Sequence, residues 1–279
     1  MLDEKIQSEL IAKGRAFTHG YLENDPYEEL FESDQERKLP QPPLVKPAMR
    51  GEDARTPLPR DFEALEMKND LLPLIRDRRS ARIYTGGEMT LLQLSFLLWA
   101  TQGVKKLRGR KYATLRTVPC GGARHEFETY LIVRRVAGLR PGAYHYLPME
   151  HTLEYLHPIA DPEQAITDSL CGQSWAAKAN VVFYWSMVPY RAEWRYGIYA
   201  HRIALIDAGH IGQNLYLACT GLNLGTCAIG AFSDPICNTL FGLDGVEEYI
   251  VYTAPVGTVR EQDTAEEAAF YSFVEDEGL

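Results

Sequence analysis

The feature that most constrains the fold is the seven-residue run from Val181 to Met187, Val-Val-Phe-Tyr-Trp-Ser-Met. Apolar or aromatic side chains occupy both odd and even positions, so a strand made of them would have to bury both faces. The run therefore predicts a central strand with other elements packed on each side. A chain of 279 residues is long enough to supply the core that such a strand requires.

The other apolar segments alternate between the helical and the strand pattern. A turn at 148–151 joins two of the strand-like segments and predicts a β-hairpin. Helices mixed with hairpins favour an α+β fold, with a mostly antiparallel sheet flanked by helices, over a Rossmann domain. The expected strands are 129–134, 143–146, 152–156, 181–187, 223–230 and 248–253, and the main expected helices are 91–102, 202–219 and a short one from 233 to Gly242.

Three regions follow from the distribution of prolines and charges. Residues 1–60 are expected to form an N-terminal arm, because the prolines at 40–47 keep that stretch extended. Residues 61–260 would form one domain, and 261–279 an acidic C-terminal extension with no Lys or Arg. The charged N-terminus has no apolar signal region, and no run is long enough to span a membrane, so we expect a cytoplasmic protein with no membrane partner.

Charge and cysteine content limit the partners. The net charge of -9 argues against nucleic acid as the main partner. The one basic run, Lys105 to Arg116, is expected to be an exposed loop. The five cysteines are scattered without metal-ligand spacing, so we expect most of them to be buried thiols and expect no metal site.

The segment Arg76-Asp77-Arg78-Arg79-Ser80-Ala81-Arg82 concentrates four arginines around a serine in this acidic chain. Guanidinium forks match phosphate oxygens, so the cluster is a candidate anion site, although a solvated helix end would also favour cations. In an extended segment Arg78, Ser80 and Arg82 would share one side. No G-x-G-x-x-G or Walker A motif occurs, so any nucleotide must be held by other means.

Four further segments are candidates for a cofactor site. Each has an ordinary structural alternative: a turn, internal hydrogen bonds, sheet pairing or an exposed Arg-Tyr pair. Adjacent glycines allow close backbone approach to a flat ligand, and a phenol can move a proton. The first segment is Pro119-Cys120-Gly121-Gly122-Ala123-Arg124, the second is Gly225–Phe232, and the third is Arg195-Tyr196. The fourth is a polar stripe on one face of the helix 202–219, made of Asp207, His210 or Ile211, and Asn214, with Gln213 beside it.

The order of these motifs resembles the nitroreductase superfamily, flavoenzymes that bind FMN without a Rossmann motif. The order is Arg-x-Ser-x-Arg, a buried helix, Pro-x-Gly-Gly-Ala-Arg, Tyr-His-Tyr before a hairpin, a Gln-Asn helix and Gly-Thr-x-x-Ile-Gly. The similarity runs from about Leu39 to Gly257. Within the superfamily it is similar to the SagB-type dehydrogenases, which oxidise thiazolines and oxazolines on peptides to thiazoles and oxazoles.

The resemblance implies an α+β homodimer with two FMN sites at the subunit interface. It assigns the phosphate, ribityl and ring-edge oxygens of FMN to Arg78, Ser80 and Arg82. Ile229 and Gly230 would offer backbone N–H groups near the flavin N5. The remaining candidates are Pro119, Cys120, Gly121, Gly122 and Ala123 from the other subunit, Gln213 and Asn214 lining the site, Arg79 as a neighbour in the arginine cluster, and Arg260 as a further phosphate ligand.

Two departures from the SagB-type pattern affect the expected chemistry. Arg195-Tyr196 stands where those dehydrogenases usually carry Lys-Tyr, and Cys120 replaces a serine. Arginine does not give up its proton, which leaves Tyr196, with Arg195 beside it, as the catalytic candidate.

The expected function is FMN-dependent hydride transfer. One form is NAD(P)H-driven reduction of a small molecule. The other is dehydrogenation of a peptide-borne azoline or a related heterocycle, with oxygen reoxidising the flavin. The alternative is a non-catalytic flavin-binding or scaffold subunit of a biosynthetic complex.

Overall fold

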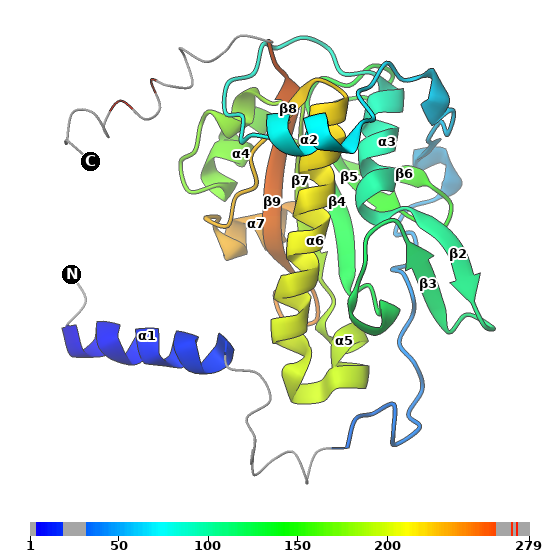
Figure 1. Ribbon diagram of the computed structural model, residues 1–279, viewed down its shortest axis with the longest axis vertical. Helices are drawn as coiled ribbons and strands as arrows, with labels where there is room; N and C mark the ends of the chain where they lie inside the picture. Colours follow the sequence, from blue (N-terminus) through cyan, green and yellow to red (C-terminus); the bar gives the residue numbers. More distant parts are fainter. Residues whose placement is uncertain (1–3, 19–31, 261–268, 270–271, 273–279) are drawn as a thin grey trace.

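A seven-stranded sheet forms the centre of the molecule in the computed structural model, which describes residues 4–18, 32–260, 269 and 272 (Figure 1). Its order is β1-β6-β5-β4-β7-β9-β8, and every neighbouring pair is antiparallel. The predicted fold class is therefore confirmed. The strands are β1 (Arg55–Pro57), β4 (Phe127–Val133), β5 (Gly142–Leu147), β6 (Thr152–His157), β7 (Val181–Met187), β8 (Leu224–Thr226) and β9 (Tyr249–Thr258).

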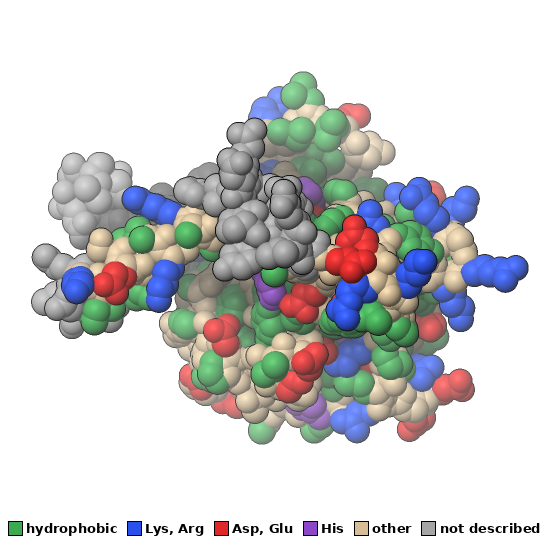
Figure 2. Space-filling model, turned by 90° about the horizontal axis from the view of Figure 1, so that it is seen from below, with side chains coloured by type: hydrophobic (Ala, Val, Ile, Leu, Met, Phe, Trp, Pro, Cys, Tyr) green, Lys and Arg blue, Asp and Glu red, His purple; other side chains and the backbone are tan. Residues whose placement is uncertain are grey.

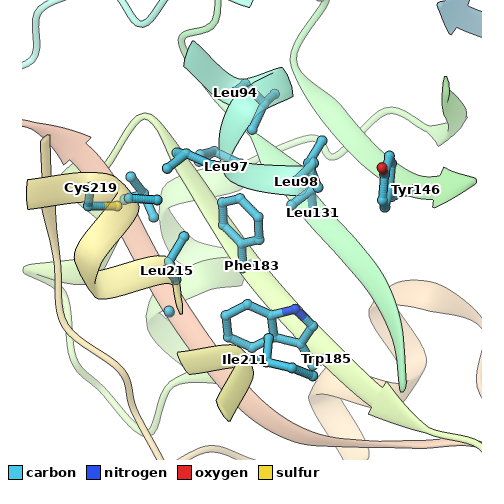
Figure 3. Close-up of a cluster of buried hydrophobic side chains, with 14 of the residues drawn as sticks. Leu94, Leu97, Leu98, Leu131, Tyr146, Phe183, Trp185, Ile211, Leu215 and Cys219 are labelled. Atoms are coloured by element: carbon cyan, nitrogen blue, oxygen red, sulfur yellow. The ribbon is translucent and has the colours of Figure 1, made fainter. Parts of the chain in front are cut away.

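The strand β7 is an interior strand with both faces buried, as its composition predicted. Phe183 and Trp185 point to a core shared with α3 (Leu91–Gln102) and α6 (Ala200–Gly221) (Figure 3). Val182 and Tyr184 point to the opposite core, which contains residues of α4 (Pro162–Ser169) and α7 (Asp234–Phe241). The sheet is therefore covered by helices on both faces.

The predicted helix 91–102 is confirmed as α3, with the expected ends. Thr90 forms a capping box with Gln93, and Gly103 follows the last helical residue. Leu94, Leu97 and Leu98 are fully buried against the sheet, and each contributes about 2 kcal/mol of burial free energy.

Some elements differ from the prediction. The basic run expected as an exposed loop is a hairpin of β2 (Val104–Arg108) and β3 (Ala113–Arg116), because Gly109 and Lys111 adopt the positive φ values that a tight turn needs. Arg116 is buried and donates to Gln102 Oε1 at 2.6 Å. Two further helices, α4 and α5 (Pro189–Tyr196), were not predicted from the sequence, and both begin with a proline.

The predicted arm has two different halves. Its first half contains the amphipathic helix α1 (Glu4–Thr18), whereas 19–31 lie outside the described residues. The second half is attached to the body. Glu154 accepts the backbone N–H groups of Met49 and Arg50 at 2.9 Å, and β1 pairs with β6 at the edge of the sheet.

The predicted acidic extension at 261–279 lies outside the described residues except for two positions. Across the described part of the chain, no helix combines the length and the hydropathy needed to cross a bilayer.

Candidate functional site

The arginine segment leaves α2 (Leu71–Asp77) as an extended chain, so successive side chains alternate in direction. The Arg78 guanidinium lies 5.2 Å from the ring centre of Tyr216 on α6, and Ser80 Oγ lies 2.9 Å from the Tyr216 hydroxyl. That hydroxyl also accepts the Ala228 N–H at 2.9 Å, so its own proton is available to Ser80. Tyr216 was missed because the sequence shows only a phenol on an apolar helix.

The other side of the same segment faces a polar cavity of about 450 Å³. Lys68, Arg79 and Arg260 line it, against the single carboxylate of Asp77, whose Oδ2 lies 3.9 Å from Lys68 Nζ. Among the described residues that line the cavity there are three cations and one acid, a composition that suits a phosphate group. Of the arginines named above as phosphate candidates, Arg79 and Arg260 line this cavity, whereas Arg78 does not.

The close approach of the arginine segment to the sheet depends on a glycine in β8. Ala81 N–H donates to the carbonyl of Thr226 at 2.9 Å. A Cβ on Gly225 would lie only 2.7 Å from Ala81 Cβ and 2.4 Å from a methyl of Val259. Gly225 is thus required here for packing, a role its position in Gly225–Phe232 did not reveal.

The Gly121-Gly122 pair lies directly on the Arg195-Tyr196 pair, which ends α5. Gly122 has a φ of +54°, and a Cβ there would lie 2.6 Å from the Tyr196 hydroxyl and 2.7 Å from Arg195 Nε. Two motifs that the sequence analysis singled out separately are therefore in contact, and glycine is required at this contact.

Two buried acidic residues, Asp207 and Glu126, lie behind this loop. Asp207 Oδ2 accepts the Gly121 N–H at 2.8 Å, and Cys120 Sγ donates to Glu126 Oε2 at 3.3 Å. Burial, and then the charge of Asp207, raise the pKa of Glu126 to about 7. Glu126 Oε1 is buried and has no hydrogen-bond partner among the described residues, which suits a neutral carboxyl better than a carboxylate. Burial also raises the pKa of Cys120, which favours the interpretation of that residue as an unreactive thiol.

Arg195 is held as a fixed cation. Its Nη1 donates to Gln35 Oε1 and to the Tyr112 hydroxyl, both at 3.0 Å. Partial burial lowers its pKa, but hydrogen bonds with Tyr196 and Tyr112 outweigh this and leave the pKa raised. A general-base role for Arg195 is excluded by this arrangement, whereas a positioning role for the adjacent Tyr196 is consistent with it.

Several other predicted ligands have different surroundings from those expected. The Ile229 N–H donates to Thr253 at 2.8 Å, so it is unavailable to a flavin, whereas Gly230 is exposed with open space around its Cα. Asn214 Nδ2 donates to Ala100, which supports the internal-hydrogen-bond alternative, and Gln213 is exposed. The Arg82 guanidinium lies 5.9 Å from the Trp175 ring centre.

The helix α6 connects the two groups of residues. Asp207 contacts the glycine loop and Tyr216 the arginine segment, nine residues apart, which is about 14 Å along a helix. The two sites therefore lie at different positions along one helix, α6, which lies over the sheet in Figure 1.

Comparison with known proteins identifies the family. The sequence profile of the Nitroreductase family matches residues 75–258. A protein of Methanocaldococcus jannaschii described as a nitroreductase is 34% identical over 199 residues, which cover 71% of this chain and 93% of that protein.

Two further relatives match smaller parts of longer proteins. The trifolitoxin-processing protein TfxB of Rhizobium leguminosarum bv. trifolii is 29% identical over 133 residues, 46% of this chain and 36% of TfxB. A nitroreductase structure from Anabaena variabilis is 29% identical with a TM-score of 0.57, covering 67% of this chain and 37% of that one. This chain thus spans little more than a third of either. The profile and the archaeal relative show that the chain belongs to the nitroreductase family of FMN-dependent oxidoreductases.

Proposed function

We propose that this protein binds FMN and transfers hydride between the flavin and a substrate held at the Gly121-Gly122 loop. The observation that carries the proposal is the cavity lined by Lys68, Arg79 and Arg260. It opens beside a segment whose other face presents Ser80, and beside the glycine-containing strand β8.

The residues present fit FMN in charge and in shape. The three cations of the cavity would hold the phosphate, and Gly230 leaves open space for a planar ring. When bound, the flavin supplies the hydride chemistry.

The protein's own contribution is to position groups around the substrate. Tyr196 offers a phenol that can donate or accept a proton, and Arg195 fixes its position from the neighbouring residue. Asp207 holds the Gly121 N–H, which keeps the loop in contact with Tyr196. The conformation of the loop thus depends on the buried Glu126–Asp207 pair.

We also propose that two copies assemble through α6 and α2. Leu205 and Ile206 of α6 are each 53% exposed, and Leu71 and Leu72 of α2, beside its C-terminal end, are more exposed still (Figure 1). These are two exposed apolar pairs at different heights along α6, and exposed apolar side chains of this kind are typical of an interaction surface. In such a homodimer the glycine loop of one subunit would meet the flavin of the other.

Among substrates, a peptide-borne azoline is the second, finer proposal. The relative TfxB is by name a toxin-processing protein, which supports a peptide substrate. The raised pKa of Arg195 leaves proton abstraction to Tyr196 in that reaction. NAD(P)H-driven reduction of a small acceptor remains the competing form of the same flavin chemistry, and a non-catalytic scaffold remains the alternative from another class.

The absorption spectrum tests the proposed function. We expect purified protein to carry FMN and show the two visible flavin bands. Anaerobic mixing with NADH or NADPH then separates the two enzymatic forms: rapid bleaching supports the reductase, and a flavin bleached only by a peptide azoline supports the dehydrogenase. Colourless protein that takes up no added FMN would contradict the proposal.

Replacing Tyr196 by phenylalanine should slow turnover by about 100-fold, since proton transfer by a positioned group contributes about that much. The flavin should remain bound, because Tyr196 contacts the loop rather than the arginine segment. Tyr199→Phe, a half-buried tyrosine one turn further on, is the matched control. Unchanged turnover in Tyr196→Phe would remove this residue from the catalytic role.

A further inference from the structure

The β2–β3 hairpin carries a cluster of exposed cations that folding does not explain. Five residues form this cluster, called here the basic hairpin: Lys105, Lys106, Arg108, Arg110 and Lys111. None of their side chains forms an ion pair or a hydrogen bond with any other described residue. Figure 2 shows Lys and Arg side chains gathered at the end of the molecule where the hairpin projects.

This concentration is unusual for the chain as a whole, which has 38 acidic and 29 basic residues. Like charges on neighbouring positions of a hairpin repel each other and lower its stability. The hairpin retains five of them without a neutralising acid, so a partner of opposite charge would relieve the repulsion. The cluster therefore indicates a binding surface for an acidic group.

The backbone of the hairpin offers a second means of binding. Within the described residues β2 pairs with β3 alone, and its outer edge leaves backbone N–H and C=O groups unpaired. An extended peptide can add to such an edge as a further strand. A polypeptide, unlike a nucleic acid, can use both this edge and the cations.

The hairpin is also connected to the candidate site. Tyr112, at its turn, receives a hydrogen bond from Arg195 at 3.0 Å, and the Arg124 guanidinium lies 4.8 Å from the Tyr112 ring centre. Arg124 Nε in turn donates to the carbonyl of Gly122 at 3.1 Å. Since β3 ends at Arg116, only about 10 Å of extended chain separates it from the loop that begins at Pro119.

We propose that the basic hairpin docks an acidic segment of a peptide substrate, whose reacting residue then lies at Gly122 and Tyr196. This inference rests on the proposed function, in the form that acts on a peptide. An acidic peptide is favoured over nucleic acid because the net charge of -9 repels a long polyanion, whereas five clustered cations match a short acidic segment.

Fluorescence anisotropy with a labelled peptide of alternating Glu and Thr tests the docking. The same peptide with Gln in place of Glu is the ligand control. The test variant is Lys105→Gln, Lys106→Gln, Arg108→Gln. The matched control is Lys13→Gln, Lys38→Gln, Arg50→Gln, which changes the net charge equally at exposed positions elsewhere. We expect the hairpin variant to bind the Glu peptide about tenfold more weakly and the control variant to bind as wild type. Binding by wild type should also weaken between about 20 and about 200 mM salt.

Three outcomes would overturn the docking proposal: equal binding of the Glu and Gln peptides, equal loss in both variants, or tighter binding of a single-stranded oligonucleotide of matching length. The readout does not depend on the flavin, so the two proposals fail separately. Colourless protein whose hairpin still binds the Glu peptide would contradict the proposed function alone. Yellow protein without this binding would contradict the docking alone.

Discussion

Replacing Arg79 by alanine is expected to weaken FMN binding by about 30-fold, because it removes a charge-assisted hydrogen bond to phosphate. Arg79 lines the cavity together with Lys68 and Arg260. The dissociation constant, measured from the quenching of FMN fluorescence on titration with apoprotein, reports this loss directly. The thermal unfolding midpoint of the apoprotein should change little, since Arg79 is exposed.

Arg76 provides the matched control, three residues earlier on α2. Its side chain is 68% exposed, it pairs with Asp77 at 3.1 Å, and it does not line the cavity. Arg76→Ala should therefore keep wild-type affinity. A loss in Arg78→Ala with full affinity in Arg79→Ala would place the phosphate on the Tyr216 side of the segment and contradict the assignment to this cavity.

Replacing Glu126 by glutamine is expected to stabilise the fold at alkaline pH. The pKa of Glu126 is raised from 4.5 to about 7 by burial and by Asp207, so the folded protein keeps a proton that the unfolded chain releases. The contribution of Glu126 to the free energy of unfolding is therefore fully present below pH 4.5, and it is lost as the pH rises from 4.5 to about 7. Glutamine stays neutral at every pH, so the gain in stability above pH 7 should be about 3 kcal/mol.

Urea unfolding at pH 8 and at pH 5 measures this difference, which should shrink below about 1 kcal/mol at the lower pH. Glu66→Gln, at an exposed position, controls for the loss of a negative charge and should show no such pH dependence. An equal gain at both pH values would show that Glu126 is not protonated in the folded protein.

The sequence predicted the fold well where local patterns and burial agree. Thr90 and Gly103 define α3, and the composition of 181–187 defines the central strand. The basic hairpin was missed because its charged residues hide the strand pattern. The short helices α4 and α5 were missed as well.

The sequence indicated candidate site residues, but it did not indicate how they lie relative to one another. The alternation of Arg78, Ser80 and Arg82 followed from an extended backbone. The cavity lined by Arg79 and Arg260 could not be predicted in this way, because these two residues are 181 positions apart in the sequence and only the folded sheet brings them together. Likewise, the N–H of Ile229 is used by Thr253, a long-range bond that no local pattern reveals. The contact of Gly122 with Tyr196 also depends on how α5 packs.

The attachment of residues 46–57 has a consequence for how small this protein can be made. Lys46 donates to the buried acids Glu128 and Glu248, and Glu154 holds the next backbone N–H groups. A chain trimmed to 75–258, the region shared with the family, would leave three buried carboxylates short of donors and expose the edge of β6. For this protein, the smallest fragment expected to fold is therefore longer than residues 75–258, the part of the chain that matches the family profile.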